Sequence, residues 1–497
     1  MKLVLSEKGD SRIKFVKNKD VICLVSKTGQ MFDSHAFFPI GMAMISASLK
    51  QAGYKVKVLD LDVYPEFDKE IINYNFIMLG LSAGSALKFS LDKIEELKSN
   101  NDKIVILGGP LVMAMPQKVM KETKADFLVH GDAEKPIVEL MEYLEGKRKL
   151  DKIMGLGFRK NGEIIINPKS MIEDLDSLPF PDTDSFNMEK YAQYVDSDLG
   201  EKSINWYTSR GCVFDCQFCF HEKNFRGQSA ERIVRDLRIL KEKYGIKGVW
   251  FYDDNFMNSV KRIKEFCALV KPLGIKWGCE ARVTSINEEM VKLMKDSGCV
   301  VIRNGLESGS DRILKVMNKA ATVNDIKKAI LTLTNMGMPV KGGFMFGVPT
   351  EAIEDAKQTS DLIKWIYRTN PKAVLWTYFF TPRPDTPWYY LSVKLGMKDY
   401  SLRDWIKLNK YDGLPYNTSN MTEKQVRKIM RRIQYYAFFA NSHKAKIFFR
   451  YILKRENFKN IPSLLSKYFY IRWDDYAVVR FAKYINRNKT VQASESG

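Results

Sequence analysis

The sequence predicts an α/β fold with an N-terminal doubly wound (Rossmann-like) parallel sheet, a central partial (β/α)6 barrel and a mainly helical C-terminal region. Two series of short apolar strands alternate with amphipathic helices, and they flank a connector punctuated by prolines. Continuously apolar strands of this kind are typical of parallel sheets that helices cover on both faces. We therefore expect domains at 1–150, 201–395 and 396–497, joined by a connector at 151–200.

The first series contains five short predicted strands, most of them followed by a helical pattern. They span 21–26, 56–60, 76–82, 104–109 and 126–130. Gly80, Gly108 and Gly109 stand at the carboxyl ends of such strands, which is the edge where doubly wound sheets bind ligands. The connector then begins with a predicted hairpin at 157–166, which turns at an Asn-Gly pair.

The second series contains six strand–helix units. Its strands are predicted at 203–208, 248–252, 276–279, 300–304, 341–347 and 374–380. Six such units form a partial barrel, and barrels of this type carry their chemistry at the carboxyl ends of the strands. The loops that follow these strands should therefore hold the functional side chains.

Composition narrows the class of protein. A chain of 497 residues that is 45% hydrophobic is long enough for roughly two to four domains with substantial cores. Its seven cysteines do not form a disulfide framework, and that favours a reducing, cytoplasmic location. No apolar run approaches the length of a membrane span, about 20 residues. The net charge is +20, and about 13 of these charges lie in residues 401–497.

Three cysteines on one predicted loop are the most informative feature of the chain. Cys212, Cys216 and Cys219 follow the first strand of the second series in the spacing C-x3-C-x2-C. Three thiolates on a tight loop can bind three irons of a [4Fe–4S] cluster, and the missing fourth cysteine leaves one iron open. A structural zinc site is the alternative, but it needs four ligands, and His221 is the only nearby candidate for the fourth.

This loop resembles the C-x3-C-x-φ-C motif of the radical S-adenosylmethionine (SAM) superfamily, in which φ is aromatic, and Phe218 takes that place. The resemblance implies that the cysteines bind the cluster and that SAM chelates the fourth iron through its amino and carboxylate groups. It also implies cleavage of SAM to methionine and a 5′-deoxyadenosyl radical, which abstracts hydrogen from a substrate. An electron donor such as ferredoxin or flavodoxin would then be a partner.

Polar residues follow the later strands in an order that suits SAM. Asp253 and Asp254 follow the second strand, where acceptors could hold an ammonium group. Arg282 follows the third strand, where a guanidinium could pair with a carboxylate. Across residues 200–390 the series resembles radical SAM barrels of the Elp3, MiaB and BchE type. The resemblance implies that Asp253 or Asp254 binds the SAM amino group and that Arg282 binds its carboxylate.

Two further strand ends complete the expected SAM site. Glu307 lies in a Gly-x-Glu-Ser-Gly segment after the fourth strand, and Gly347 and Pro349 form a Gly-x-Pro turn after the fifth. Glycine there would allow the backbone to approach an adenine. The same resemblance implies that Glu307 binds the ribose and that the turn lies beside the adenine. Asp385 stands where a closing segment of such barrels usually has glycine.

The first domain resembles the cobalamin-binding domains that are attached to such barrels. The resemblance rests on Phe38–Gly41 before a helix, on the strand ends at Ser82, Gly108 and Gly109, and on the segment 130–134. Small residues at these ends would suit a flat corrin on the edge of the sheet. The alternative is a domain of the same fold that binds no cobalamin.

His35 is a candidate cobalt ligand. Residues 33–38 resemble the D-x-H-x-x-G segment of some B12 proteins, although Phe38 replaces the glycine. The barrel-linked group generally lacks a ligating histidine, so the alternative is a loop histidine that is satisfied by protein partners.

Together the resemblances imply a cobalamin-dependent radical SAM methyltransferase that acts on an unactivated carbon of a small-molecule or lipid-like substrate. A radical cyclisation, rearrangement or C–C coupling without methyl transfer is one alternative. A non-catalytic B12 or cluster sensor is another, and it would cleave no SAM.

Cations and aromatic side chains interleave over residues 425–475. A solvated helical face, a surface on anionic lipid and an RNA-binding surface are the three interpretations. No recognisable RNA-binding module accompanies the region, so nucleic acid is the least favoured partner. Peripheral contact with a membrane is the functional hypothesis, and the solvated face is its alternative.

Overall fold

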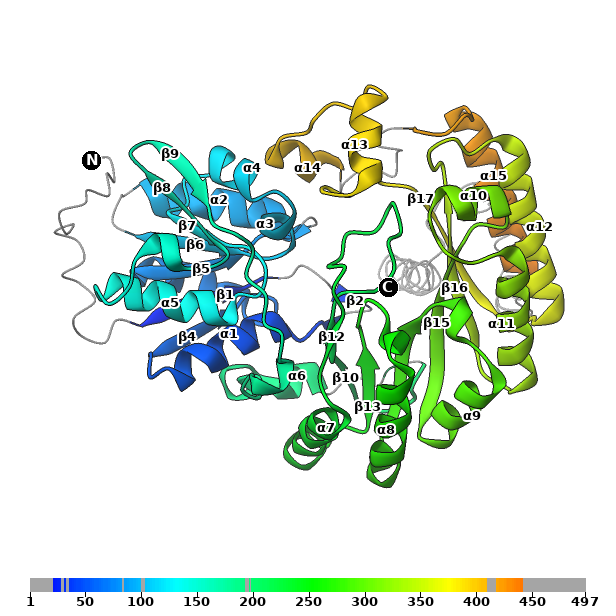
Figure 1. The fold of residues 1–497 in the computed structure, drawn as a ribbon, viewed down its shortest axis with the longest axis horizontal. Helices are drawn as coiled ribbons and strands as arrows, with labels where there is room; N and C mark the ends of the chain where they lie inside the picture. Colours follow the sequence, from blue (N-terminus) through cyan, green and yellow to red (C-terminus); the bar gives the residue numbers. More distant parts are fainter. Residues whose placement is uncertain are drawn as a thin grey trace, which may run out of the picture.

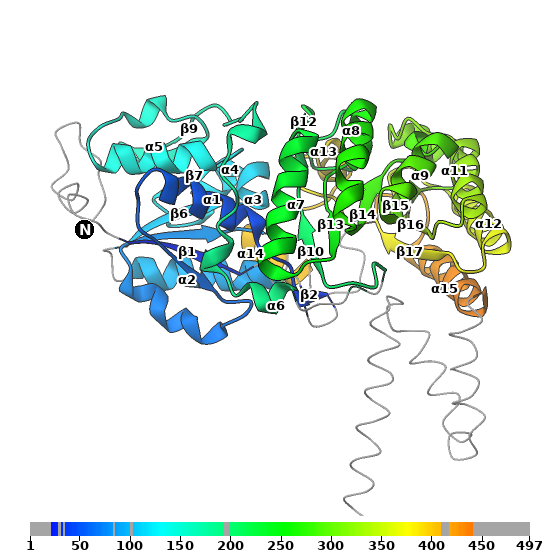
Figure 2. The same ribbon diagram turned by 90° about the horizontal axis from the view of Figure 1, so that it is seen from below.

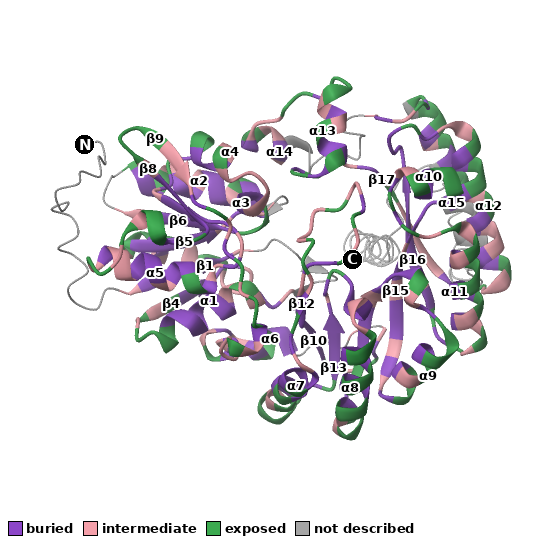
Figure 3. Ribbon diagram, in the orientation of Figure 1, coloured by how far each residue is buried: buried purple, intermediate pink, exposed green. Residues whose placement is uncertain are grey.

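The computed structural model describes residues 21–440, apart from 28–30, 33–34, 83–84, 100–102, 193–195, 197 and 409–416. Two sheets lie side by side along the longest axis of the molecule, each with its own helices (Figure 1, Figure 2). Their strands are mostly buried, whereas the outer faces of the helices are exposed (Figure 3). The α/β class that the sequence predicts is confirmed.

The first domain is built on a seven-stranded sheet in the order β4-β1-β5-β6-β7-β8-β9. In that order the strands span Val56–Asp60, Ile22–Ser26, Phe76–Gly80, Ile104–Gly108, Phe127–Val129, Leu156–Lys160 and Glu163–Ile166. The first five are parallel, and the strand order reverses between β1 and β5. Ligands of doubly wound sheets bind at such a switch point.

Helices cover both faces of this sheet. On one face, α1 (Ile40–Gln51) and α5 (Glu134–Leu144) pack together. On the other, α2 (Ser85–Ser99), α3 (Pro110–Ala114) and α4 (Pro116–Glu122) bury a separate apolar cluster. Burial on both faces explains why the strands are continuously apolar.

The predicted hairpin at 157–166 extends the first sheet rather than opening the connector. β8 pairs antiparallel with β7, and β9 pairs antiparallel with β8. Phe158 of this hairpin is buried and lies opposite Phe127. Without the hairpin, the edge of β7 would present unpaired backbone donors and acceptors. The connector therefore starts later than the sequence predicts, after Ile166.

The second domain contains six parallel strands in chain order, β10-β13-β14-β15-β16-β17. They span Ser203–Trp206, Gly248–Phe251, Lys276–Ala281, Cys299–Glu307, Val340–Phe346 and Val374–Phe379. Helices α7 (Ala230–Tyr244), α8 (Val260–Val270), α9 (Glu288–Asp296), α11 (Val323–Asn335) and α12 (Ile353–Thr369) lie outside this sheet (Figure 1). The inner face and the carboxyl ends of the strands are left for a site, as six strand–helix units predict.

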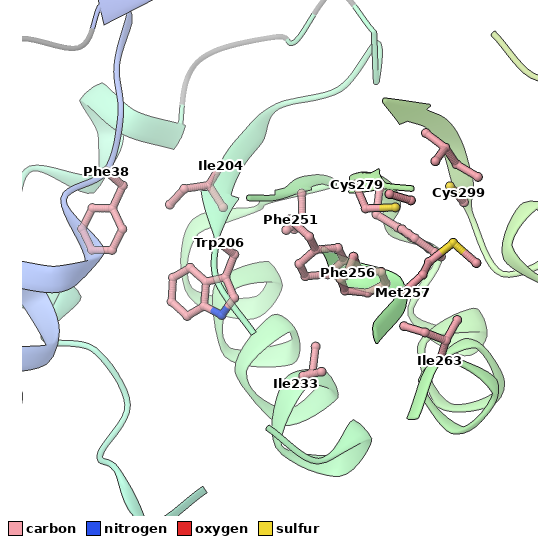
Figure 4. Packing of buried hydrophobic residues seen from close by; sticks show 14 of the residues in the cluster. Phe38, Ile204, Trp206, Ile233, Phe251, Phe256, Met257, Ile263, Cys279 and Cys299 are labelled. Carbon is pink, nitrogen blue, oxygen red and sulfur yellow. The ribbon is translucent and has the colours of Figure 1, made fainter. Parts of the chain in front are cut away.

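One apolar cluster crosses from the first domain to the second (Figure 4). Phe38, just before α1, stacks on Trp206 of β10 with ring centroids 6.3 Å apart. Phe186 and Tyr191 of the connector contact the same Phe38 ring edge to face, at 5.3 Å and 5.5 Å. The two domains therefore share a packed joint.

After β17 the chain returns to the first domain. α13 (Pro387–Lys394) and α14 (Leu402–Leu408) bring Tyr389 and Trp405 into the apolar cluster on α2. The predicted boundary at 395 thus falls inside a unit that bridges both domains.

The last element described in the predicted C-terminal region is a helix. α15 (Glu423–Ala440) packs against α12. The rest of the predicted tail, residues 441–497, lies outside the described residues. Among the residues that are described, no helix combines the length and the apolarity that a membrane crossing needs.

Candidate functional site

A cavity of about 840 Å³ lies at the carboxyl ends of the strands of the second domain. It brings together most of the residues that the sequence predicts for a cofactor site: Cys212, Cys216, Phe218, Cys219, Asp253, Asp254, Arg282 and Glu307. These residues come from distant parts of the sequence, and they meet because parallel strands end at one edge of the sheet.

The cysteine loop is fixed at its base by a two-stranded ribbon. β11 (Ser209–Arg210) pairs antiparallel with β12 (Arg226–Gly227). Gly211 has a φ of 80°, and a Cβ there would lie 2.3 Å from a backbone oxygen across the turn. Cys212 then donates its N–H to the carbonyl of Glu222 at 2.8 Å. Only glycine fits this turn, so the first cysteine is held in a fixed register.

The three thiols line the same cavity. Cys212 and Cys216 are buried, and Cys219 is exposed. In the described part of the chain, no three His, Cys, Asp or Glu side chains are placed to bind one metal ion. Each cysteine of a cubane cluster binds a different iron, so its thiols need not converge on one point. Burial raises the pKa of the Cys212 thiol, and ligation must therefore displace a proton.

The two acids after β13 have different surroundings. Asp253 is buried and accepts hydrogen bonds from the Thr208 N–H at 2.6 Å and from Thr208 Oγ1 at 2.5 Å. It also lies 3.6 Å from Arg262. Asp254 is exposed and lines the cavity. Asp253 is thus occupied in holding the chain that follows β10, whereas Asp254 faces the cavity.

Arg282 lies beside the cysteines with donors to spare. Its Nη1 is 3.2 Å from the sulfur of Cys216, and its Cζ is 3.8 Å from the ring centroid of Phe214. The side chain is buried, and its Nε and Nη2 have no hydrogen-bond partner among the described residues. A buried guanidinium with two unpaired donors in a cavity suits a carboxylate ligand.

Glu307 sits at an irregularity of the sheet. The register of β15 against β16 shifts between Gly305 and Glu307, where Glu307 has a φ of 62°. Its Oε1 pairs with Lys319 at 3.1 Å, and its Oε2 accepts a hydrogen bond from Tyr378 at 3.2 Å. A Cβ on Gly305 would lie 2.4 Å from Glu307 Oε1. The backbone is strained here to fix one carboxylate, as is common at functional sites.

Lys319 is a candidate that sequence reasoning missed. It follows α10 (Asp311–Val316), is buried and lines the cavity. No strand-end pattern marks it, because it enters the cavity from the loop that follows a helix. The one available signal was the need of a buried Glu307 for a cation, which a nearby lysine could meet.

Gly347 and Pro349 are not among the residues that line this cavity. The Gly347 N–H donates to Glu351 at 2.6 Å, and its carbonyl accepts a hydrogen bond from Thr418 at 3.1 Å. Burial raises the pKa of Glu351 to about 8. The backbone groups of Gly347 therefore bond to neighbouring protein, and the position of this turn beside an adenine stays a prediction.

A second cavity, of about 520 Å³, lies between the carboxyl edge of the first sheet and β10. Ser82, Gly108 and Gly109 line it, at the positions that the sequence predicts. Three other lining residues have buried polar atoms without a hydrogen-bond partner in the described part of the chain, namely Ser26 Oγ, Ser209 Oγ and Gln228 Oε1. Small residues beside unsatisfied polar atoms suit a flat ligand with polar edge groups, as a corrin with its amides is.

The two cavities meet at one wall. Phe37 and Asn205 line both of them. Phe37, from the first domain, contacts Tyr252 of the second edge to face, with ring centroids 5.0 Å apart. A ligand in one cavity would therefore lie across these side chains from a ligand in the other.

His35 and Phe218 are the remaining predicted residues. His35 belongs to the short strand β3 (His35–Ala36), and its side chain lies outside the described residues, so its role stays a prediction. Phe218 packs against Trp388 of α13 with ring centroids 5.9 Å apart. The aromatic position of the motif therefore anchors the cysteine loop as well as lining the cavity.

Comparison with protein families agrees with the positions of both cavities. The family model of the radical SAM superfamily matches residues 206–363, and that of the B12 binding domain matches residues 35–141. The first match includes the three cysteines, and the second includes Phe37 and the small residues of the smaller cavity.

Individual relatives extend over most of the chain. The chain is 30% identical to an uncharacterised methyltransferase of Pyrococcus horikoshii over 406 residues, which cover 78% of this chain and 86% of that protein. It is 26% identical to cytidylyl-2-hydroxyethylphosphonate methyltransferase of Streptomyces wedmorensis, over 65% of this chain and 72% of that protein. The solved structure of the cobalamin-dependent SAM radical enzyme OxsB shares the fold, with a TM-score of 0.68 at 17% identity over 96% of this chain and 76% of that one.

Proposed function

Because this chain belongs to the radical SAM superfamily and carries a B12-binding domain, we propose that it methylates an unactivated carbon of a small-molecule substrate. Its cofactors are a [4Fe–4S] cluster, SAM and cobalamin. When bound, the cluster and SAM supply a 5′-deoxyadenosyl radical that abstracts hydrogen from the substrate, and methylcobalamin supplies the methyl group.

The larger cavity offers complementary groups for SAM. Cys212, Cys216 and Cys219 would bind the cluster and leave one iron for the methionine part of SAM. The two unpaired donors of Arg282 support a role in binding the SAM carboxylate. The exposure of Asp254 to the cavity supports a role in binding the SAM amino group.

Glu307 would hold the ribose hydroxyls. Lys319 and Tyr378 each contact one of its two oxygens, and an ionised carboxylate has about four acceptor positions. Each oxygen therefore keeps an acceptor position for a ribose hydroxyl, while its partners hold the group in place. In the smaller cavity, Gly108 and Gly109 would face the corrin, where a longer side chain would occupy its space.

The shared wall at Phe37 and Asn205 is the observation that carries this proposal. Methyl transfer to a substrate radical requires that the methyl donor and the radical reach the same carbon atom. Two cavities that are separated only by side chains meet this requirement, whereas two distant cavities would not.

The test uses anaerobically reconstituted enzyme with cobalamin, a reductant and SAM that carries a deuterated methyl group. Supplied with host lipid and small-molecule extracts, the enzyme should form 5′-deoxyadenosine and a product that carries the label, both detected by mass spectrometry. A new product without label would favour cyclisation, rearrangement or C–C coupling. Absence of SAM cleavage would favour a sensor.

We also propose that a ferredoxin or flavodoxin supplies the electron and that the basic C-terminal region contacts anionic lipid. On α15, Lys424, Lys428 and Arg432 are exposed, whereas Val426 and Ile429 are buried. A helix with exposed cations would bind an anionic surface at low salt and leave it at high salt. If the protein sediments equally with anionic and neutral vesicles, the proposed lipid contact is wrong. The support that this contact gives to a lipid-like substrate is then lost as well.

A further inference from the structure

The residue at the base of the cysteine loop is ion-paired with the first domain. Arg210 Nη1 lies 2.6 Å from Asp132 Oδ1, and both terminal nitrogens of Arg210 bond to the carboxylate of Glu134. Asp132 and Glu134 are buried. Arg210 ends β11, so only Gly211 separates this ion-paired residue from Cys212.

A second arginine ties the other strand of the ribbon to the same carboxylate. Arg226 of β12 stands opposite Arg210, and it pairs with both Asp132 and Glu222. The carbonyl of Glu222 accepts the N–H of Cys212 at 2.8 Å. Both ends of the cysteine loop are therefore held by charge against one acid of the first domain.

This network connects the two cavities. Asp132, Glu134 and Arg210 line the smaller cavity, and Cys212 lines the larger one. Although burial alone would raise it, Arg210 and Arg226 hold the pKa of Asp132 below its usual value. The acid is therefore ionised at neutral pH, and the ion pairs are present when a ligand enters.

We propose that Arg210 is a positioning residue that couples cobalamin binding in the smaller cavity to SAM binding at the cysteine loop. A buried ion pair has little water to replace a lost partner, so a ligand that shifts Asp132 or Glu134 must shift Arg210 too. Gly211 cannot absorb that shift, because its turn is packed against backbone. The displacement therefore reaches Cys212, and each cofactor changes the affinity for the other by the same factor.

Equilibrium binding of SAM to cluster-loaded protein, with and without saturating hydroxocobalamin, tests this coupling. In the wild-type protein the two dissociation constants should differ by about fivefold or more. In Glu134→Gln, which keeps the size of the side chain and removes its charge, Asp132 still pairs with Arg210, so the two constants should differ by clearly less than in the wild type while corrinoid absorbance shows the cavity filled.

Glu142→Gln is the matched control. Glu142 lies on the same helix as Glu134, α5, and pairs with Arg148 at 2.8 Å. Neither Glu142 nor Arg148 lines either cavity, so cobalamin should change the SAM dissociation constant of this variant as much as it does in the wild type. If Glu134→Gln does not fold, Arg210→Lys replaces it, since lysine keeps the charge and loses the two-pronged contact.

Three results would overturn the coupling. The first is a wild-type protein that binds cobalamin but has the same SAM dissociation constant with and without it, a result that leaves the proposed function intact. The second is a folded, cofactor-loaded Glu134→Gln or Arg210→Lys protein in which cobalamin changes the SAM dissociation constant as much as it does in the wild type. The third is a wild-type protein that binds no cobalamin, which would also remove the proposed function.

Discussion

Asn205 holds the main chain of Phe38 through two hydrogen bonds that cross between the domains. The Phe38 N–H donates to Asn205 Oδ1 at 2.8 Å, and Asn205 Nδ2 donates to the Phe38 carbonyl at 3.0 Å. A side-chain amide can satisfy both backbone groups because it carries a donor and an acceptor. Since Phe37 and Asn205 also separate the two cavities, this one contact fixes both the domain joint and the wall between the cofactors.

Asn205→Ala should weaken both the fold and the binding of cobalamin. The change leaves the buried N–H of Phe38 without a partner, while the carbonyl keeps the Ile40 N–H at 2.9 Å. An unpaired buried group costs about 1–3 kcal/mol. Urea denaturation should therefore show a loss of stability of that order. Corrinoid affinity should fall in parallel, because Phe37 is no longer held at the wall.

Asn370→Ala is the control for that variant. Asn370 also makes two hydrogen bonds, to Thr334 and to the N–H of Lys372, but both lie within the second domain. It should lower stability without changing the affinity for cobalamin. Equal corrinoid affinities in Asn205→Ala and the wild type would show that the joint does not shape the cavity.

Glu307→Gln should weaken SAM binding and leave the iron content unchanged. The substitution removes the charged acceptor that is proposed for the ribose and leaves Lys319 without its counter-ion. Hydrogen bonds to a charged group are worth about 1.5–3 kcal/mol, so the dissociation constant should rise about tenfold or more. Tyr378→Phe, which removes only one hydrogen bond to Glu307, should have a smaller effect. An unchanged affinity in Glu307→Gln would place this residue outside the SAM site.

The sequence was sufficient for those features that depend on local pattern. Continuous apolar strands predict both parallel sheets, and the cysteine spacing predicts the loop that the larger cavity contains. The small residues Ser82, Gly108 and Gly109 were predicted at a ligand edge for the same reason, since strand ends of a parallel sheet share one side.

Features that depend on long-range pairing could not be predicted in this way. Whether Asp253 or Asp254 is available depends on Thr208 and Arg262, which no local pattern connects to them. Lys319 reaches the cavity only because the chain after α10 folds back toward Glu307.

The pH dependence of stability should report on Glu351. This side chain is fully buried, and burial raises its pKa from 4.5 to about 8. The unfolded chain loses this proton near pH 4.5, whereas the folded chain keeps it up to about pH 8. The stability that protonated Glu351 contributes is thus complete below about pH 4.5, and it falls as the pH rises from there to about pH 8. Glu351→Gln cannot ionise, so urea denaturation across these pH values should show a shallower decline.

Glu354→Gln, at an exposed position three residues later on α12, serves as the control for Glu351→Gln and should keep the wild-type decline. A decline of the same steepness in Glu351→Gln would mean that Glu351 already ionises at its usual pH in the folded protein.

The most direct test of the account is electron paramagnetic resonance of protein that is purified anaerobically after expression with cobalamin. In the Co(II) state, the cobalt signal should lack nitrogen splitting from a protein ligand, and it should change when the neighbouring [4Fe–4S] cluster is reduced and becomes paramagnetic. Nitrogen splitting that disappears in His35→Ala would instead assign that histidine to cobalt. A cobalt signal that is indifferent to the state of the cluster, or a protein without corrinoid, would contradict the claim that the two cofactors face each other across Phe37 and Asn205.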